Sequence, residues 1–213
     1  EADGIYGSYT MGPEGQRVQV ILLDTRYNRS PLKPTDQRGA AGRERYIPDT
    51  TPGLTMLGDA QWAWLDQQLR QPADLRLIVS SVQVVAEGHG WERWGNFPAE
   101  RQRLYDLIRT TGAKGVVMLS GDRHHSAIHR LPADAPGGVG YPLYDFTSSA
   151  VNMPWGGGAD EVSQTRISPI EGRENYGLVQ IDWQGRQLTL TTFGTADEAR
   201  FTQAIRFAEI GLP

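Results

Sequence analysis

Apolar runs alternate with helical patterns through the first 125 residues of the chain. The runs cover 18–23, 75–83 and 116–119, and each is followed by polar residues. Near-continuous apolar runs of this length are typical of strands that are covered on both faces of a parallel or mixed sheet. Residues 59–69 and a segment from Pro98 to Gly112 separate the runs and have helical periodicity. This order predicts an α/β fold with three parallel strands.

The two helices have recognisable boundaries and apolar faces. In the first, Asp59 lies in the first turn, and Trp62, Leu65 and Leu69 share one face. We therefore expect Trp62 and its neighbour Trp64 to be packing groups rather than ligand platforms, because large aromatic side chains dominate core area. The second helix begins at a proline and is closed by a glycine, which is the usual asymmetry of helix ends.

The pattern changes after Arg130, where period-two alternation replaces helical spacing. This alternation predicts strands over 141–149, 176–183 and 188–193. Near the start of the chain, a short edge strand is also expected around residues 5–10. The segment after Thr195 fits either a capping box or a strand, and we expect a strand. Two long irregular segments, 27–55 and 150–175, have the length of functional loops.

Composition narrows the possible functions. A chain of 213 residues that is 38% apolar can form one core, so a single domain over 1–213 is the simplest organisation. The net charge of −4 argues against specific nucleic-acid binding. The absence of cysteine excludes disulfides, thiolate catalysis and cysteine-bound metals. No apolar run is long enough to span a membrane, and no signal peptide is recognisable within the chain.

The first long loop is basic within an acidic chain. Between Arg26 and Arg45 there are six basic and two acidic side chains, a local charge of +4. A focused positive field favours an anionic substrate, although a merely solvated loop is an equally good interpretation for most of these residues. Arg26 is the exception, because it directly follows the apolar run 18–23.

The strongest candidate chemistry follows the third apolar run. Ser120-Gly121 ends that run, and Asp122 and His124 then supply side chains suited to a metal site. On an extended loop, residues two apart project to the same side, which leaves His125 to face elsewhere as a supporting or substrate-contacting group. A His-rich surface turn is the alternative, because a metal site needs about four ligands.

Polar residues at the ends of all three runs favour the metal site over that alternative. The carboxyl ends of parallel strands share one edge of a sheet, where ligands bind in open α/β folds. We therefore expect several side chains to gather there: Asp24, Arg26, Ser80, Ser81, Gln83, Asp122 and His124. The loop 89–96 either lines a pocket at this edge or caps the core with its two tryptophans.

Several motifs in a fixed order resemble the alkaline phosphatase D (PhoD-like) family of metallophosphoesterases. They are Asp24-Thr-Arg-Tyr27, Met56-Leu-Gly58 with Gln61-Trp62, Ser80-Ser-Val-Gln83, Asn96-Phe-Pro98-x-Glu100-Arg101, Ser120-Gly-Asp-Arg-His124 and Tyr144-Asp-Phe-Thr-Ser-Ser149. The resemblance covers nearly the whole chain. It implies the carboxyl-terminal portion of a four-layer α/β/β/α sandwich with mixed sheets, and hydrolysis of phosphate esters at a two-metal centre.

The resemblance also implies roles for individual residues. Asp122 and His124 match ligand positions for different metals of a pair, with iron and calcium as the family precedent. Arg26 and His125 are then candidate catalytic groups, and Arg123 and Asn152 are candidates for substrate binding. The resemblance further implies a periplasmic or secreted protein that acts on a small phosphate ester.

The chain departs from the family in one respect. Family members carry a Gly-Asp-x-x-Tyr segment and an Asp-Asp-His-Asp-like segment, which supply most other ligands, and neither occurs in this sequence. We therefore expect an incomplete domain and an incomplete metal site. Two hypotheses remain open: a phosphoric ester hydrolase, or a non-catalytic remnant that binds phosphate or a partner chain. Uncovered apolar strands and edges would then favour a homo-oligomer or association with a missing upstream half.

Overall fold

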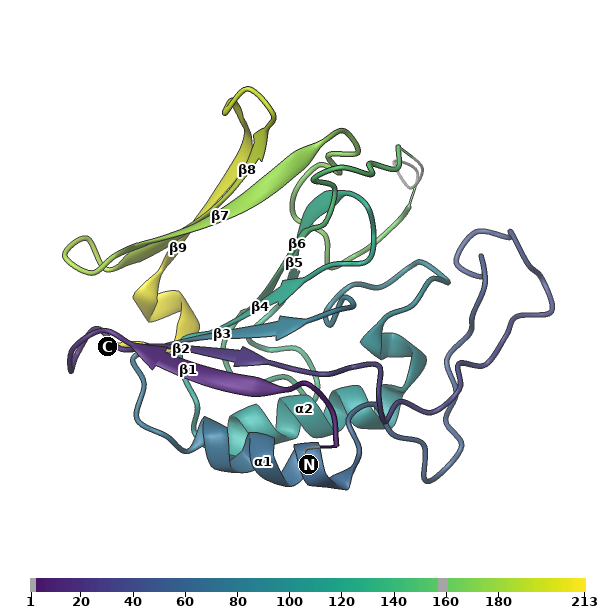
Figure 1. Cartoon of the computed structure of the whole chain (residues 1–213), viewed down its shortest axis with the longest axis horizontal. Coiled ribbons are helices and arrows are strands. Elements are labelled where there is room, and N and C mark those ends of the chain that lie inside the picture. Colours follow the sequence, from purple (N-terminus) through teal and green to yellow (C-terminus); the bar gives the residue numbers. More distant parts are fainter. Residues whose placement is uncertain (1–2, 157–160) are drawn as a thin grey trace.

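A mixed six-stranded sheet forms the centre of the protein in a computed structural model that describes residues 3–156 and 161–213 (Figure 1). Its strands are β1 (Gly7–Met11), β2 (Val18–Leu22), β3 (Leu75–Ser80), β4 (Val116–Ser120), β5 (Ser126–Leu131) and β6 (Leu143–Ser148). They lie in the order β1-β2-β3-β4-β6-β5. The four central strands are parallel, as predicted for the first three of them, and the edge strands β1 and β5 are antiparallel to their neighbours.

Helices α1 (Asp59–Leu69) and α2 (Pro98–Thr110) cover one face of this sheet (Figure 1). Both begin and end close to where the sequence predicted. Leu65 and Leu69 of α1, with Leu104 and Ile108 of α2, are essentially inaccessible to solvent. Burial of one such side chain stabilises the fold by about 1.5–3 kcal/mol. Trp62 is also buried, in agreement with its predicted packing role. Among the described residues, no helix is long and apolar enough to cross a membrane.

A smaller antiparallel sheet lies over the opposite face of the large one (Figure 1). It contains β7 (Asn175–Asp182), β8 (Gln187–Gly194) and β9 (Ala199–Arg206), so the ambiguous final segment is a strand. The two sheets approach closely at Gly177, where an added Cβ would lie 2.8 Å from the Phe146 ring. Only glycine fits this approach without a shift of the ring.

The described residues therefore form three layers, with helices, a mixed sheet and a second sheet. The α/β class with mixed sheets is confirmed, and the fourth, helical layer of the expected sandwich is absent from the part of the chain that the structure describes. The contact between the sheets is incomplete. A cleft of about 520 Å³ remains between them, lined in part by Val79, Leu119, Phe146 and Val179.

The sequence failed to predict strand β5, which follows the Asp122–His125 segment. Its residues Ser126 and His129 are polar yet buried, so the strand lacks an apolar signature. Strand β3 is also shorter than predicted. It ends at Ser80, whose Oγ donates to the carbonyl of Val82 at 2.7 Å as the chain turns into a loop. In the predicted long loop 150–175, the glycines 157 and 158 lie outside the described residues.

Candidate active site

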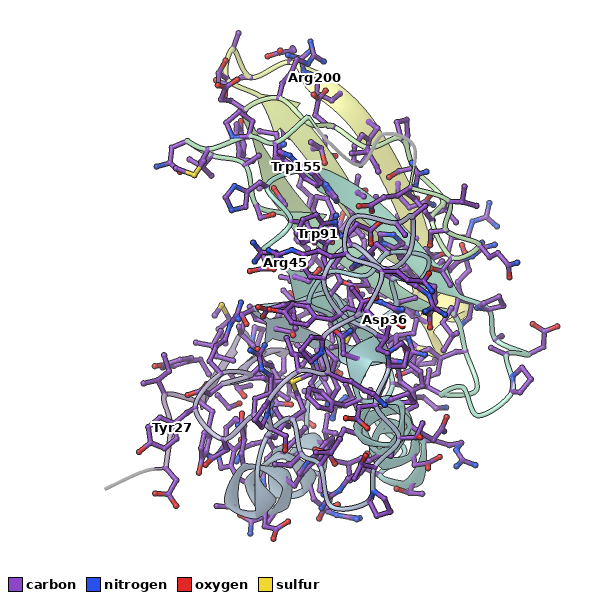
Figure 2. All side chains as sticks on the ribbon, turned by 90° about the vertical axis from the view of Figure 1, so that its right-hand side faces the viewer. Tyr27, Asp36, Arg45, Trp91, Trp155 and Arg200 are labelled. Carbon is purple, nitrogen blue, oxygen red and sulfur yellow. The ribbon has the colours of Figure 1, made fainter. Side chains whose placement is uncertain are left out.

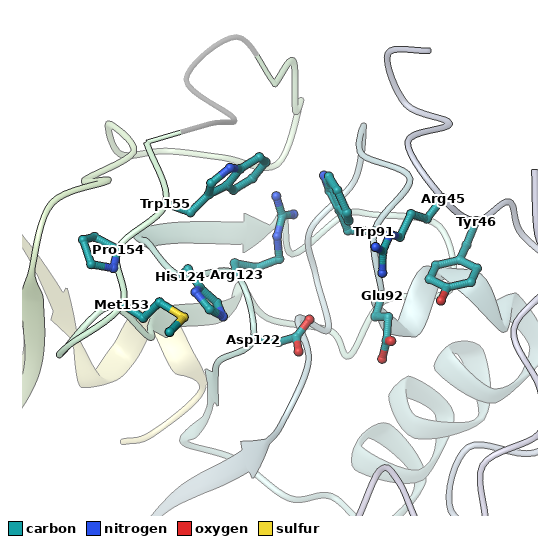
Figure 3. Close-up of a pocket in the computed structure, with 10 residues that line it drawn as sticks. All are labelled: Arg45, Tyr46, Trp91, Glu92, Asp122, Arg123, His124, Met153, Pro154 and Trp155. Atoms are coloured by element: carbon teal, nitrogen blue, oxygen red, sulfur yellow. The ribbon is translucent and has the colours of Figure 1, made fainter. Parts of the chain in front are cut away.

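A cavity of about 430 Å³ opens beyond the carboxyl ends of the parallel strands (Figure 3). This is the edge at which open α/β sheets bind ligands. The cavity is built by loops that follow β2, β3, β4 and β6, and its lining residues are Arg45, Tyr46, Trp91, Glu92, Asp122, Arg123, His124, Met153, Pro154 and Trp155. Asp122, Arg123 and His124, which belong to the segment predicted to bind metal, therefore all line the cavity.

Asp122 and His124 line the cavity with an unusual backbone conformation. Their φ angles are +72° and +54°, in the left-handed region that non-glycine residues rarely occupy. The prediction of an extended segment here is therefore wrong, although both side chains face the same cavity. The amide of Trp155 donates to the carbonyl of His124 at 2.8 Å and ties this segment to the loop after β6. Strained residues of this kind cluster at functional sites.

Arg26 joins two carboxylates at the edge of the cavity. Its Nη2 lies 2.9 Å from Oδ1 of Asp122, and its Nη1 pairs with Glu92. Arg29 also pairs with Glu92, at 2.7 Å. The side chain of Arg26 remains 45% exposed, so an incoming anion can reach the guanidinium. The predicted approach of Arg26 and Asp122 at the strand ends is therefore confirmed.

Other polar residues that were expected at this edge have structural roles instead. The carboxylate of Asp24 accepts hydrogen bonds from the amides of Ile5, Arg26 and Tyr27 at 2.9–3.0 Å, which shapes the loop after β2. Gln83 is buried, and its amide group contacts Thr147 and His89. The residues Ser80 and Ser81 line the cleft between the two sheets rather than the cavity.

Arg123 lines the cavity and is almost completely buried. It forms an ion pair with Glu161, and its guanidinium carbon lies 6.0 Å from the centroid of the Trp155 ring. Its Nη1 atom has no hydrogen-bond partner among the described residues. A buried donor without a partner is costly, which makes this atom available to a ligand that enters the cavity.

His125 and Asn152 lie outside the set of cavity residues. The His125 side chain is buried, and burial, with Arg123 and other nearby cations, lowers its pKa to about 3. Its ring is therefore neutral at neutral pH and faces the interior. Asn152 is exposed beside Met153, which does line the cavity. The catalytic role of His125 and the substrate-binding role of Asn152 stay predictions.

Seven of the ten cavity residues were not identified as site residues from the sequence, and four of these seven come from two loops. Arg45 and Tyr46 come from the basic loop, and Trp91 and Glu92 come from the loop after β3. Their signal was present only as a basic segment and a crowded aromatic loop. The amides of Arg45 and Tyr46 both donate to the carbonyl of Gly90, at 3.1 and 2.8 Å, which joins the two loops.

The metal ligands that the sequence suggested meet the requirements of a metal site only in part. Asp122 and His124 have suitable donor types and line one cavity. Across residues 3–156 and 161–213, however, no group of three or more His, Asp, Glu or Cys side chains could hold a metal ion. The described residues therefore do not form a metal centre by themselves, and a complete coordination shell requires further donors.

Comparisons with known proteins agree with the motifs and the fold. Residues 1–192 match the family model described as PhoD-like phosphatase. Alkaline phosphatase D of Bacillus subtilis (strain 168) is 26% identical over 129 residues, which cover 56% of this chain and 21% of that protein. A solved structure described as "Structure of PhoD" matches with a TM-score of 0.66 at 18% identity, covering 94% of this chain and 40% of that chain.

The chain thus spans about a fifth of the curated relative and two fifths of the solved one. At this identity, the structural match supports the fold alone. The family model is more informative, because it matches nearly the whole sequence and includes the segments that carry Arg26, Asp122 and His124. This chain therefore belongs to the PhoD-like phosphatase family.

Proposed function

We propose that this chain binds phosphate esters in the cavity beside Asp122 and contributes to their metal-dependent hydrolysis by activated water. Family membership supports hydrolase chemistry, and the arginines beside the cavity (Arg26, Arg45 and Arg123) support an anionic substrate. The observation that carries the proposal is the position of Arg26, which contacts Asp122 at the carboxyl ends of the parallel strands and remains partly exposed.

Arg26 is suited to bind a phosphoryl group. Its planar guanidinium presents parallel N–H donors that match two phosphoryl oxygens. In the structure these donors bind Glu92 and Asp122. The oxygens of a phosphate that enters the cavity would replace one of these carboxylates as the partner of the Arg26 guanidinium. The guanidinium would then neutralise charge that grows on the phosphoryl oxygens during attack.

Asp122 and His124 would contribute two ligands to a metal site that is completed by other donors. The chemistry that a bound metal pair supplies is polarisation of the phosphoryl oxygens and activation of water. Iron and calcium are the ions that the family resemblance suggests. This chain would bind the ester, orient it with Arg26 and hold the two ligand side chains on a strained, hydrogen-bonded loop.

Calorimetric titration of the purified chain with inorganic phosphate tests the binding step. We expect Arg26→Ala to weaken phosphate binding by at least tenfold, because a charge-assisted hydrogen bond contributes about 1.5–3 kcal/mol. Arg43→Ala is the matched control, since Arg43 lies in the same basic loop and makes only an exposed ion pair with Asp36 at 3.8 Å. Equal losses in both variants would indicate diffuse attraction and contradict a defined phosphate site.

A non-catalytic phosphate-binding protein is the second candidate function. It is favoured by the shortage of metal donors among the described residues. The two functions differ in metal content and turnover. Bound metal together with ester hydrolysis, both lost in Asp122→Ala, would support the hydrolase. Phosphate binding without bound metal or turnover, when iron and calcium are supplied, would support the second candidate.

A further inference from the structure

Two tryptophans at the cavity do not belong to the hydrophobic core. The chain has six tryptophans, and four of them lie in the core or pack against it: Trp62, Trp64, Trp94 and Trp183. Trp91 and Trp155 instead contact each other, edge to face, with ring centroids 5.5 Å apart. Both line the cavity, and Trp155 is 39% exposed. Core packing therefore does not account for this pair.

Two arginines flank the tryptophan pair. The guanidinium carbon of Arg45 lies 5.6 Å from the Trp91 ring centroid, and that of Arg123 lies 6.0 Å from the Trp155 ring centroid. Figure 3 shows the Arg123 guanidinium directed toward the gap between the two indoles, with Asp122 on the other side of the cavity. Arg45, Trp91 and Trp155 also lie close together on one face of the molecule in Figure 2. Planar cations and indoles here form one cluster.

Close backbone contacts hold the cluster in place. Gly90, beside Trp91, packs so closely on the basic loop that an added Cβ would lie 2.5 Å from the amide nitrogen of Glu44. The backbone of Trp155 is tied to the carbonyl of His124. The two indoles therefore sit on loops that are fixed to each side of the cavity. A preorganised aromatic surface of this kind reduces the entropic cost of binding.

We infer that Trp91 and Trp155 form a subsite for a planar aromatic substituent of the phosphate ester. This inference rests on the proposed function, in which the phosphoryl group lies beside Arg26 and Asp122. The cavity volume of about 430 Å³ suits a small phosphate ester with a ring. An aromatic ring stacks on an indole and is attracted to the guanidinium planes of Arg45 and Arg123. A polyol substituent would gain neither interaction.

The two indoles and Arg45 also line a second groove of about 780 Å³, and Asp122 is not among its lining residues. The tryptophan pair is thus shared by the cavity and the groove, which lie next to each other. A substituent longer than one ring would continue past the indoles into the groove. The subsite therefore selects for the group next to the phosphorus and leaves room for what is attached beyond it.

Calorimetric titration of the whole chain with three probes tests the inference. The probes are phenyl phosphate, glycerol 1-phosphate and inorganic phosphate. We expect phenyl phosphate to bind about tenfold more tightly than glycerol 1-phosphate, the upper range for an aromatic contact. Trp91→Leu and Trp155→Leu should abolish this preference, because they lower the affinity for phenyl phosphate far more than the affinity for inorganic phosphate. Trp91→Phe, which keeps a ring, should retain most of the preference.

Trp64→Leu is the matched control, because Trp64 lies on helix α1, packs against Tyr6 and does not line the cavity. This variant should not affect the preference. Equal affinities for phenyl phosphate and glycerol 1-phosphate in the wild-type chain would overturn the inference. So would an equal loss for all three probes in the tryptophan variants. If inorganic phosphate does not bind the wild-type chain either, the proposed function fails as well.

Discussion

Asp145 connects the candidate active site to the central sheet, and its replacement gives a sharp test of how the site is supported. The residue lies on β6 and is completely buried. One carboxylate oxygen accepts hydrogen bonds from the amides of Val84 and Val85, at 2.7 and 2.9 Å, and the other accepts from the hydroxyl of Ser120 at 2.7 Å. Val84 and Val85 begin the loop that carries Trp91 and Glu92.

The structure predicts very different costs for two substitutions of Asp145. Asp145→Ala leaves two buried amides without an acceptor, at about 1–3 kcal/mol each, so the loss is about 2–6 kcal/mol. This is a large part of a total stability of about 5–15 kcal/mol. Asp145→Asn keeps an oxygen for the amides and turns an N–H toward Ser120, whose hydroxyl has Thr147 as its alternative partner at 2.8 Å. We expect that variant to lose less than about 1.5 kcal/mol.

Asp145 should also contribute a pH dependence. Burial raises the pKa of this carboxyl, although the hydrogen bonds from Val84, Val85 and Ser120 oppose the shift. A raised native pKa means that the folded state binds the proton more tightly than the unfolded state does. The resulting stabilisation is present below the unfolded pKa of about 3.9 and is lost as the pH rises through the native value. The wild-type chain should therefore gain stability relative to Asp145→Asn on acidification.

Urea unfolding, followed by tryptophan fluorescence and circular dichroism between pH 4 and 8, measures both effects. Glu14→Gln is a suitable control for charge removal, because Glu14 makes only an exposed ion pair with Arg17 at 3.8 Å. If Asp145→Asn costs as much as Asp145→Ala, the carboxylate charge matters more than the acceptor geometry and the reasoning is refuted. The pH argument is refuted if the stability difference between wild type and Asp145→Asn stays constant.

Three further predictions concern the site and the assembly. With an ester substrate, Arg26→Ala should lower turnover about one hundredfold, and Arg38→Ala should lower it far less. Steady-state kinetics measure both losses, and equal losses would exclude a defined phosphoryl contact at Arg26. Asp122→Ala and His124→Ala should lose any bound metal, whereas His125→Ala should retain it. Elemental analysis measures the metal content, and an unchanged content in Asp122→Ala would contradict the prediction. The open cleft between the sheets should drive self-association, and light scattering that gives a monomer mass at all concentrations would contradict this.

The sequence predicted the elements whose burial pattern is regular. Helix α1 has the predicted bounds, and β2, β3 and β4 are parallel, because apolar periodicity and helix boundaries were clear. Strand β5 was missed because its buried His129 and Ser126 are stabilised by tertiary contacts that no local pattern reveals. The Ser126 hydroxyl, for example, contacts the carbonyl of Thr147 at 2.7 Å.

The candidate site was predictable only where it follows directly from a strand. Arg26 and Asp122 follow β2 and β4, so the topology alone brings them together. Glu92 and Trp155 could not be located in this way, because loop length and composition do not determine a path in space. The left-handed backbone at Asp122 was not predicted either, because Asp occupies that region only occasionally, although more often than most non-glycine residues.

The arrangement of the loops explains how a site made largely of irregular segments can be rigid. Each loop that lines the cavity is fixed to another loop or strand by backbone groups. Gly90 accepts from the amides of the basic loop, His124 accepts from Trp155, and the loop after β3 donates to Asp145. The first two anchors connect loops that follow different strands, and the third connects a loop to strand β6, so the loops are coupled to one another and to the sheet. The cavity geometry is therefore set by the parallel sheet, and replacing one anchor should alter side chains on two loops at once.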